Sequence, residues 1–149
     1  MSPVEEYRLF YLSGEKMKVL AIVFLMSFSV LAQVDFKTVS ADSGLALSDA
    51  FGIGTAQPVK RSVIGIEIPS GFNGDSLSFQ AKNSGSSTWF NVFNQGVQVA
   101  FPASASRFII LDSDLLVNMD SLKIRSGTYT DPDSLTADIN YRVKIFELK

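Results

Sequence analysis

The chain contains no cysteine and no histidine, and it has a single tryptophan in 149 residues. These absences exclude thiol nucleophiles, disulfides, imidazole bases and the usual ligand sets for zinc, haem and iron–sulfur clusters. Charge is also scarce, since 13 Lys and Arg residues against 15 Asp and Glu residues give a net charge of −2. Such a balance lacks the basic patch that attracts nucleic acid or an anionic membrane. We therefore expect no cofactor, no bound metal and no nucleic-acid partner.

An apolar run lies near the N-terminus. Residues 19–32 are almost continuously hydrophobic and follow two lysines. A membrane span needs roughly 20 apolar residues, so this shorter run is typical of the hydrophobic part of a signal peptide. Val30 and Ala32 suit the −3 and −1 positions of a signal-peptidase site, which predicts cleavage between Ala32 and Gln33.

The residues before Met17 have no place in a signal peptide, and a start codon assigned too early explains them. On this interpretation residues 1–16 are a mis-assigned start or leader, residues 17–32 are a signal peptide or membrane anchor, and residues 33–149 form one folded domain. Two alternatives remain open. The anchor stays uncleaved with the domain outside the membrane, or translation starts at Met26 without export and gives a cytoplasmic protein.

The folded part shows short alternating apolar and polar runs broken by Gly, Asn, Ser and Pro. This pattern predicts an all-β fold, an antiparallel β-sandwich of jelly-roll type with about 8–9 strands. The expected strands are residues 34–39, 45–51, 59–68, 76–82, 88–93, 97–101, 107–111, 122–125 and 139–148. Residues 113–119 are the one segment where we expect a short helix, with Leu115, Leu116 and Met119 on its apolar side.

The core is predicted from residues that alternate with polar neighbours along three of these strands, because side chains on a strand point to opposite faces in turn. The expected core residues are Leu77, Phe79, Ala81, Val97, Val99, Phe101, Ile139, Tyr141, Val143 and Ile145.

Catalytic groups are hard to find in this composition. The serines have no histidine or suitable lysine as a base, and nearly all the carboxylates fall in expected turns, so we predict no catalytic residues. Asp112, Asp114 and Asp120 could supply oxygen ligands to calcium, but the glycine and terminal glutamate of a known calcium loop are missing. Capping of the expected helix by Asp112 or Ser113 is the preferred interpretation.

Aromatic residues stand beside two polar loops. Trp89 and Phe90 follow the turn that begins at Asn83, and Tyr129 lies in residues 126–133. Aromatic faces next to amides and hydroxyls are what a carbohydrate-binding surface needs, whereas a tryptophan in such a place more often closes one end of the sandwich. Both interpretations stay open for Trp89 and for Tyr129.

Lys123 and Arg125 alternate with Leu122 and Ile124, so both cations should lie on the outer face of one strand. They could pair with an acidic partner subunit. The alternative is a solvated face, or a charged cover for a sheet edge.

Two resemblances extend across these motifs. The stretch LSFQAKNSGSSTWFNVFNQ, with SRFIIL and LKIRS after it, resembles discoidin-like galactose-binding jelly rolls. The ordered set GIEIPSGFNGDSLSFQ, the Thr88-Trp89 turn, SRFIIL, LKIRSGT, a proline-containing loop and a final strand is more specific. That set resembles a family of small tailed-phage virion proteins, and it spans about residues 63–148.

The second resemblance implies a non-enzymatic structural protein on the head surface or a fibre of a bacteriophage. Its partners would be capsid or other virion proteins and further copies of itself, as a homo-oligomer and by expectation a trimer, with possible contact to a cell-surface glycan. Its location would be the virion, or outside the cytoplasm if the export signal is used. A secreted or periplasmic carbohydrate-binding module is the alternative.

Overall fold

A computed structural model describes residues 33–53, 60–117 and 119–148. The expected leader, the apolar run and Ala32 lie outside these residues. Within the described ranges no helix has the length and hydropathy that a membrane crossing requires.

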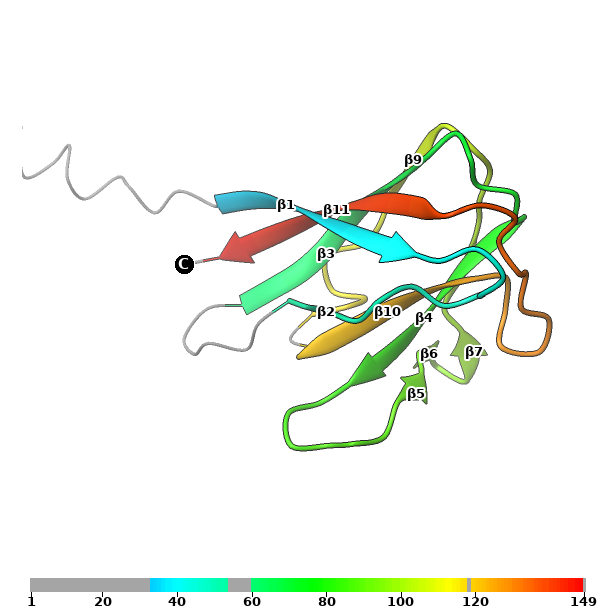
Figure 1. Cartoon of the computed structure of the whole chain (residues 1–149). Helices are drawn as coiled ribbons and strands as arrows, with labels where there is room; N and C mark the ends of the chain where they lie inside the picture. Colours follow the sequence, from blue (N-terminus) through cyan, green and yellow to red (C-terminus); the bar gives the residue numbers. More distant parts are fainter. Residues whose placement is uncertain (1–32, 54–59, 118, 149) are drawn as a thin grey trace, which may run out of the picture. The chain divides into compact units, whose positions relative to one another are not determined.

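The first sheet has four antiparallel strands (Figure 1). In spatial order these are β1 (Gln33–Ala41), β11 (Ile139–Leu148), β3 (Lys60–Ile68) and β9 (Arg107–Ile110). β1 and β11 pair along nine residues, and β11 pairs with β3 along its other edge, where a bulge interrupts the register between Lys144 and Ile145. β11 is therefore the central support of this sheet.

The second sheet is built from shorter pieces. It orders β2 (Phe51–Gly52), β10 (Ser121–Ser126), β4 (Ser76–Lys82) and β5 (Phe90–Asn91), and β8 (Ala100–Pro102) also pairs with β4. β6 (Phe93–Asn94) and β7 (Val97–Gln98) form a separate hairpin. The tip of that hairpin, Gln95 and Gly96, has positive φ values of 51° and 80°, as a tight turn requires.

The chain alternates between the two sheets as a jelly roll does. β1, β3, β9 and β11 belong to the first sheet, and β2, β4, β5, β8 and β10 belong to the second. This distribution of antiparallel strands confirms the predicted β-sandwich of jelly-roll type. The described residues contain 11 strands rather than 8–9, because the expected strands 88–93 and 97–101 are each broken in two, at Val92 and at Val99.

The expected strand 45–51 is mostly an irregular segment that lies beside β10. Only Phe51 and Gly52 remain as strand β2. The segment is nevertheless fixed to β10, because Ser48 donates its N–H to the Ile124 carbonyl at 2.9 Å and Ser126 donates to the Ala46 carbonyl at 2.8 Å. The Ser48 hydroxyl also accepts the Ile124 N–H at 2.9 Å, and this side-chain bond replaces a regular ladder bond.

The helix expected at residues 113–119 is wrong, since turns occupy residues 113–117. The Asp112 carboxylate accepts the Asp114 N–H at 3.1 Å, and the Asp112 carbonyl accepts the Leu115 N–H at 3.1 Å. These bonds close a turn at its first residue, and the segment is too short for a stable helix to propagate. The apolar residue Leu116 is buried from within this turn.

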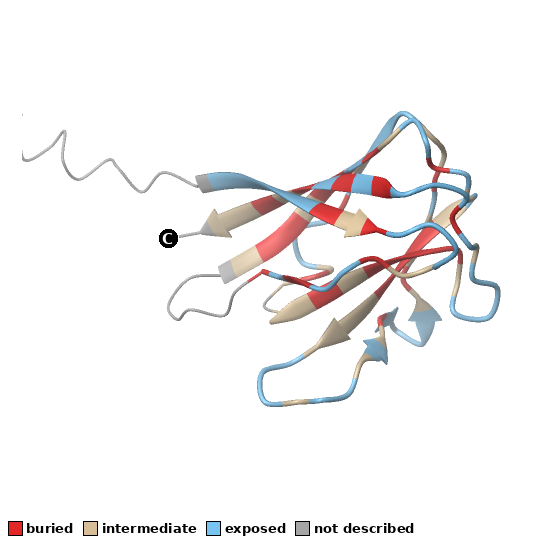
Figure 2. Cartoon of the chain, viewed as in Figure 1, coloured by how far each residue is buried: buried red, intermediate tan, exposed pale blue. Residues whose placement is uncertain are grey.

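The core lies between the two sheets (Figure 2). Seven of the ten predicted core residues are buried, and Ala81 and Phe101 pack against the core partly buried. Val97 is the error: it is 72% exposed because it belongs to the β6–β7 hairpin rather than to a sheet strand. The predicted alternation is confirmed most fully on β11, where Ile139, Tyr141, Val143 and Ile145 all point inward.

Candidate functional site

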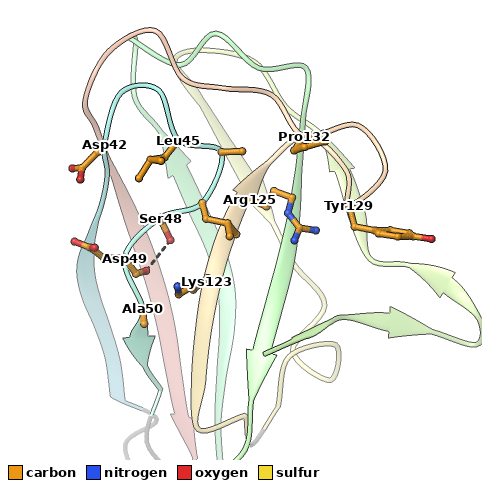
Figure 3. Close-up of a pocket in the computed structure, with 11 residues that line it drawn as sticks. Asp42, Leu45, Ser48, Asp49, Ala50, Lys123, Arg125, Tyr129 and Pro132 are labelled. Atoms are coloured by element: carbon orange, nitrogen blue, oxygen red, sulfur yellow. Dashed lines mark hydrogen bonds between the residues drawn. The ribbon is translucent and has the colours of Figure 1, made fainter. Parts of the chain in front are cut away.

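A groove of about 550 Å³ lies against β10. One wall is the segment of residues 42–50, and Tyr129 and Pro132 from the next loop form the other. Lys123 and Arg125 reach the groove from β10 itself (Figure 3). Their neighbours Leu122 and Ile124 are buried in the core, so both cations lie on the outer face of β10, as the alternation predicts.

The loop that carries Tyr129 is held by backbone bonds. Gly127 adopts a φ of +79°, and its N–H donates to the Ser76 carbonyl at 2.8 Å. The Asp133 N–H returns to the Ser126 carbonyl at 3.0 Å, and the Thr128 hydroxyl accepts the Asp131 N–H at 3.1 Å. This wall of the groove is therefore ordered by its own hydrogen bonds.

Only 8% of Arg125 is exposed, although its side chain projects from the outer face of the sheet. Its Nη1 donates to the Asn91 Oδ1 at 2.9 Å, and the same oxygen accepts the Gln80 Nε2 at 3.3 Å. Burial lowers the pKa of the Arg125 guanidinium, yet an arginine keeps its charge in proteins. The guanidinium is thus a fixed cation that a neutral amide holds in place.

No carboxylate pairs with either groove cation among the described residues. The ion pairs found there are Arg61 with Glu147, at 2.6 Å, and Arg142 with Glu67, at 3.8 Å. Asp42 and Asp49 do line the groove, but Figure 3 shows their carboxylates on the far side and directed away from Arg125.

Trp89 is partly buried and is not a member of the sandwich core. The ammonium nitrogens of Lys82 and Lys123 lie 5.1 Å and 5.0 Å from the centre of its ring. Cations at this distance are attracted to the electron-rich face of the indole. Trp89 therefore touches the groove indirectly, through Lys123.

The other aromatic candidates divide into two places. Phe90 and Asn83 line a separate depression of about 240 Å³, and both are exposed. The Tyr129 ring points away from Arg125 (Figure 3) and packs edge-on against Phe93, with 5.9 Å between ring centres. The groove thus brings together Lys123, Arg125 and Tyr129, whereas Asn83 and Phe90 lie elsewhere.

Sequence reasoning missed Asn91, which positions the Arg125 guanidinium. Local sequence gives no sign of this role, because Asn91 comes close to Arg125 only through the pairing of β5 with β4 and of β4 with β10. The role of residues 42–50 as a wall of the groove was also missed, because residues 45–51 are expected to form a regular strand. Asp112, Asp114 and Asp120 form no site, because no group of three or more acidic residues in the described ranges could hold a metal ion.

The expected signal-peptidase site falls at the edge of the described chain. Gln33 is the first residue of β1, and Ala32 lies outside the described residues.

Comparison with known proteins identifies no family for this chain. No family model matches the chain. No curated protein matches it either. A chain from the solved structure of Bacillus endospore appendages, described as a novel family of disulfide-linked pili, aligns with 80% of this chain and 90% of its own length. The identity is 10% and the TM-score is 0.37. The fold assignment accordingly rests on the strand order of the two sheets.

Proposed function

We propose that this chain is a non-enzymatic structural protein of a bacteriophage particle, on the head surface or a fibre, and that it works by protein–protein contact. The observation that carries this proposal is the outer face of the four-stranded sheet, which exposes large apolar side chains at both of its edges. The motif resemblance over residues 63–148 supplies the phage setting.

The apolar side chains stand in two groups. On β1, Val34 and Phe36 are 43% and 45% exposed; on β9, Phe108 and Ile110 are 46% and 80% exposed. Register places both groups on the same outer face, because Phe36 is opposite Lys144, which is opposite Gly65, which is opposite Ile110. Each group is a pair of exposed apolar side chains at one edge of this face, and exposed apolar patches on a soluble domain are typical of interaction sites.

A second copy of the chain is the partner that fits this face. The two apolar groups lie at opposite edges of the sheet, so the β9 side of one copy can pack on the β1 side of the next. A head-to-tail contact of this kind closes into a ring when the rotation permits it, and the expected trimer is one such ring. Of the charged residues between the groups, Arg142 and Glu67 form an ion pair, and Lys144 lies between Phe36 and Gly65 in the register.

Intact-mass spectrometry of the natural protein tests the phage setting. The proposal expects the chain in purified particles, at a constant ratio to the major capsid protein. Recovery of a chain that begins at Gln33 from the extracytoplasmic fraction of a bacterium, with none in particles, would contradict it.

The second candidate function is a secreted or periplasmic carbohydrate-binding module. The groove beside Tyr129, with two cations and two carboxylates around it, favours this function because sugar hydroxyls both donate and accept hydrogen bonds. Gene neighbours separate the two candidates: genes for capsid, portal or tail proteins support the first, and genes for glycan use support the second. A virion protein that also contacts a glycan would account for both the exposed apolar face and the groove.

A further inference from the structure

We propose that the groove against β10 binds an oxyanion carried by an acidic polysaccharide, with Arg125 as the main anion ligand and Lys123 as the second. This proposal deepens the glycan contact suggested above, and it is independent of self-association through the four-stranded sheet.

The first step is the state of the Arg125 charge. A buried charge is normally compensated by an opposite charge, because leaving water is costly. Arg125 is buried, but its guanidinium donates a hydrogen bond to the Asn91 amide oxygen, and neither ion pair of the described residues includes it. The guanidinium therefore keeps a full positive charge at the groove.

The second step is geometry. A guanidinium has five N–H donors in a rigid fork that matches the paired oxygens of a carboxylate or sulfate. The Asn91 oxygen accepts from both Gln80 and Arg125, so the fork is held in one orientation before any ligand arrives. Preorganisation of this kind reduces the entropy lost on binding.

The third step is the second cation. Lys123 is two residues from Arg125 on the same face of β10, which separates the two Cα atoms by about 7 Å. Its ammonium also lies 5.0 Å from the Trp89 ring centre, so the ring restricts where it points. Two cations at this spacing can contact one charged sugar together.

The fourth step favours a polysaccharide over an acidic protein. Asp42 and Asp49 also line the groove, with their carboxylates on the side away from Arg125, where they would repel a run of acidic side chains but accept hydrogen bonds from sugar hydroxyls. In a polymer in which charged and neutral sugars alternate, a charged sugar can contact Lys123 and Arg125 while the hydroxyls of a neutral sugar contact Asp42 and Asp49.

The test measures binding of the full chain to hyaluronan fragments, an alternating uronate polymer, and to the same fragments after carboxyl reduction. We expect binding of hyaluronan that weakens with added salt, and at least tenfold weaker binding of the carboxyl-reduced fragments. Equal binding of both forms would overturn the proposal.

Asn91→Asp is the decisive variant, because a carboxylate at this position would pair with Arg125 inside the protein. The substitution is nearly isosteric and should leave the fold intact, while it weakens hyaluronan binding about tenfold or more. Unchanged binding by this folded variant would overturn the proposal. Arg125→Gln should have the same effect on binding, and its thermal unfolding shows whether the fold survives.

Lys123→Met and Lys82→Met form a matched pair. Both lysines lie about 5 Å from the same Trp89 ring, and of the two only Lys123 lines the groove. Weaker binding by Lys123→Met alone is expected, whereas equal losses in the two variants would mean that general charge, and not this site, attracts the polymer.

Competition identifies the anionic group and its carrier. Displacement of bound hyaluronan by dextran sulfate, or of bound dextran sulfate by hyaluronan, supports a shared anion site if Arg125→Gln weakens the binding of both. The polymer that competes at the lower concentration shows whether sulfate or carboxylate is preferred. Poly-glutamate that competes as well as hyaluronan would overturn the polysaccharide and point to an acidic protein. Self-association of Asn91→Asp should equal that of the wild type, so failure here leaves the proposed particle role intact.

Discussion

The two sheets of this domain differ in strand length, in how continuously their strands pair and in the chemistry of their outer faces. In the four-stranded sheet, β1, β11 and β3 are nine to ten residues long and pair along nearly their whole lengths, and the outer face exposes apolar side chains. In the five-stranded sheet, three of the five strands have two or three residues, loops pack against β10, and the outer face carries Lys82, Lys123 and Arg125. Regular pairing leaves a continuous outer face, to which we assign self-association, whereas interrupted pairing leaves the groove, to which we assign the polysaccharide.

The strongest test of this comparison adds a methyl group to one glycine on each side, Gly127 in the loop that follows β10 and Gly65 in β3. At Gly127, φ is +79°, and a Cβ would meet the Asp131 carbonyl oxygen and come within 2.7 Å of the Asp133 nitrogen. Backbone atoms cannot move aside, so Gly127→Ala should lower the free energy of unfolding by about 2–4 kcal/mol. Urea denaturation measures this loss.

Gly65→Ala is the counterpart in the four-stranded sheet. The added Cβ would meet only the ring of Phe108, at 2.7 Å from Cε1, besides a contact of 3.3 Å with a backbone oxygen. Phe108 is half-exposed and can rotate away, so we expect a loss of about 1 kcal/mol or less. A loss as large as that of Gly127→Ala would show that the Phe108 ring is fixed and not free to move.

Tyr141→Phe tests the core that the two sheets share. The Tyr141 ring is buried and packs edge-on against Phe72, with 6.2 Å between ring centres, and its hydroxyl has no hydrogen-bond partner among the described residues. Removing an unpaired buried hydroxyl should raise the free energy of unfolding by about 1 kcal/mol. A destabilised variant would mean that the hydroxyl has a partner.

The same residue predicts a dependence on alkaline pH. Burial raises the pKa of Tyr141 above that of the unfolded chain, because the charged phenolate is poorly solvated in the core. The unfolded state therefore loses this proton first, and stability falls as the pH rises above about 10. Tyr141→Phe should lose less stability over that range, as urea titrations at pH 8 and above would show.

The smallest expected effect concerns the loop that joins the two sheets before β11. The Asp138 carboxylate accepts the Ser43 N–H at 2.8 Å, and this bond lowers the pKa of Asp138. Its contribution is present above the unfolded pKa and is lost as the pH falls through the folded one. Asp138→Asn should make stability slightly less sensitive to pH in the acid range, and an unchanged acid titration would contradict this.

The sequence predicts the regular elements well, because period-2 alternation identifies both a strand and its buried face. Strands 76–82 and 139–148 have the bounds expected, and their inward residues form the core. The interrupted sheet is less predictable. Residues 45–51 have the composition of a strand, but the Ser48 hydroxyl competes for the β10 backbone, and such competition depends on tertiary contacts.

The candidate site was predictable only in part, for the same reason. Alternation along one strand is enough to place Lys123 and Arg125 on the same outer face. The burial of Arg125 and its bond to Asn91 depend on three paired strands and two loops, so local sequence gives no sign of them. The apolar outer face of the four-stranded sheet likewise appears only once the register is known.

Sedimentation velocity of the full chain tests the central claim, that the four-stranded sheet is the surface for self-association and the groove is not. Wild type and Asn91→Asp should both sediment as the same oligomer. Ile110→Lys, which puts a charge on the most exposed apolar residue of that face, should sediment as the 16.3 kDa monomer. A wild-type protein that is already monomeric, or an Ile110→Lys variant that remains oligomeric, would contradict the account.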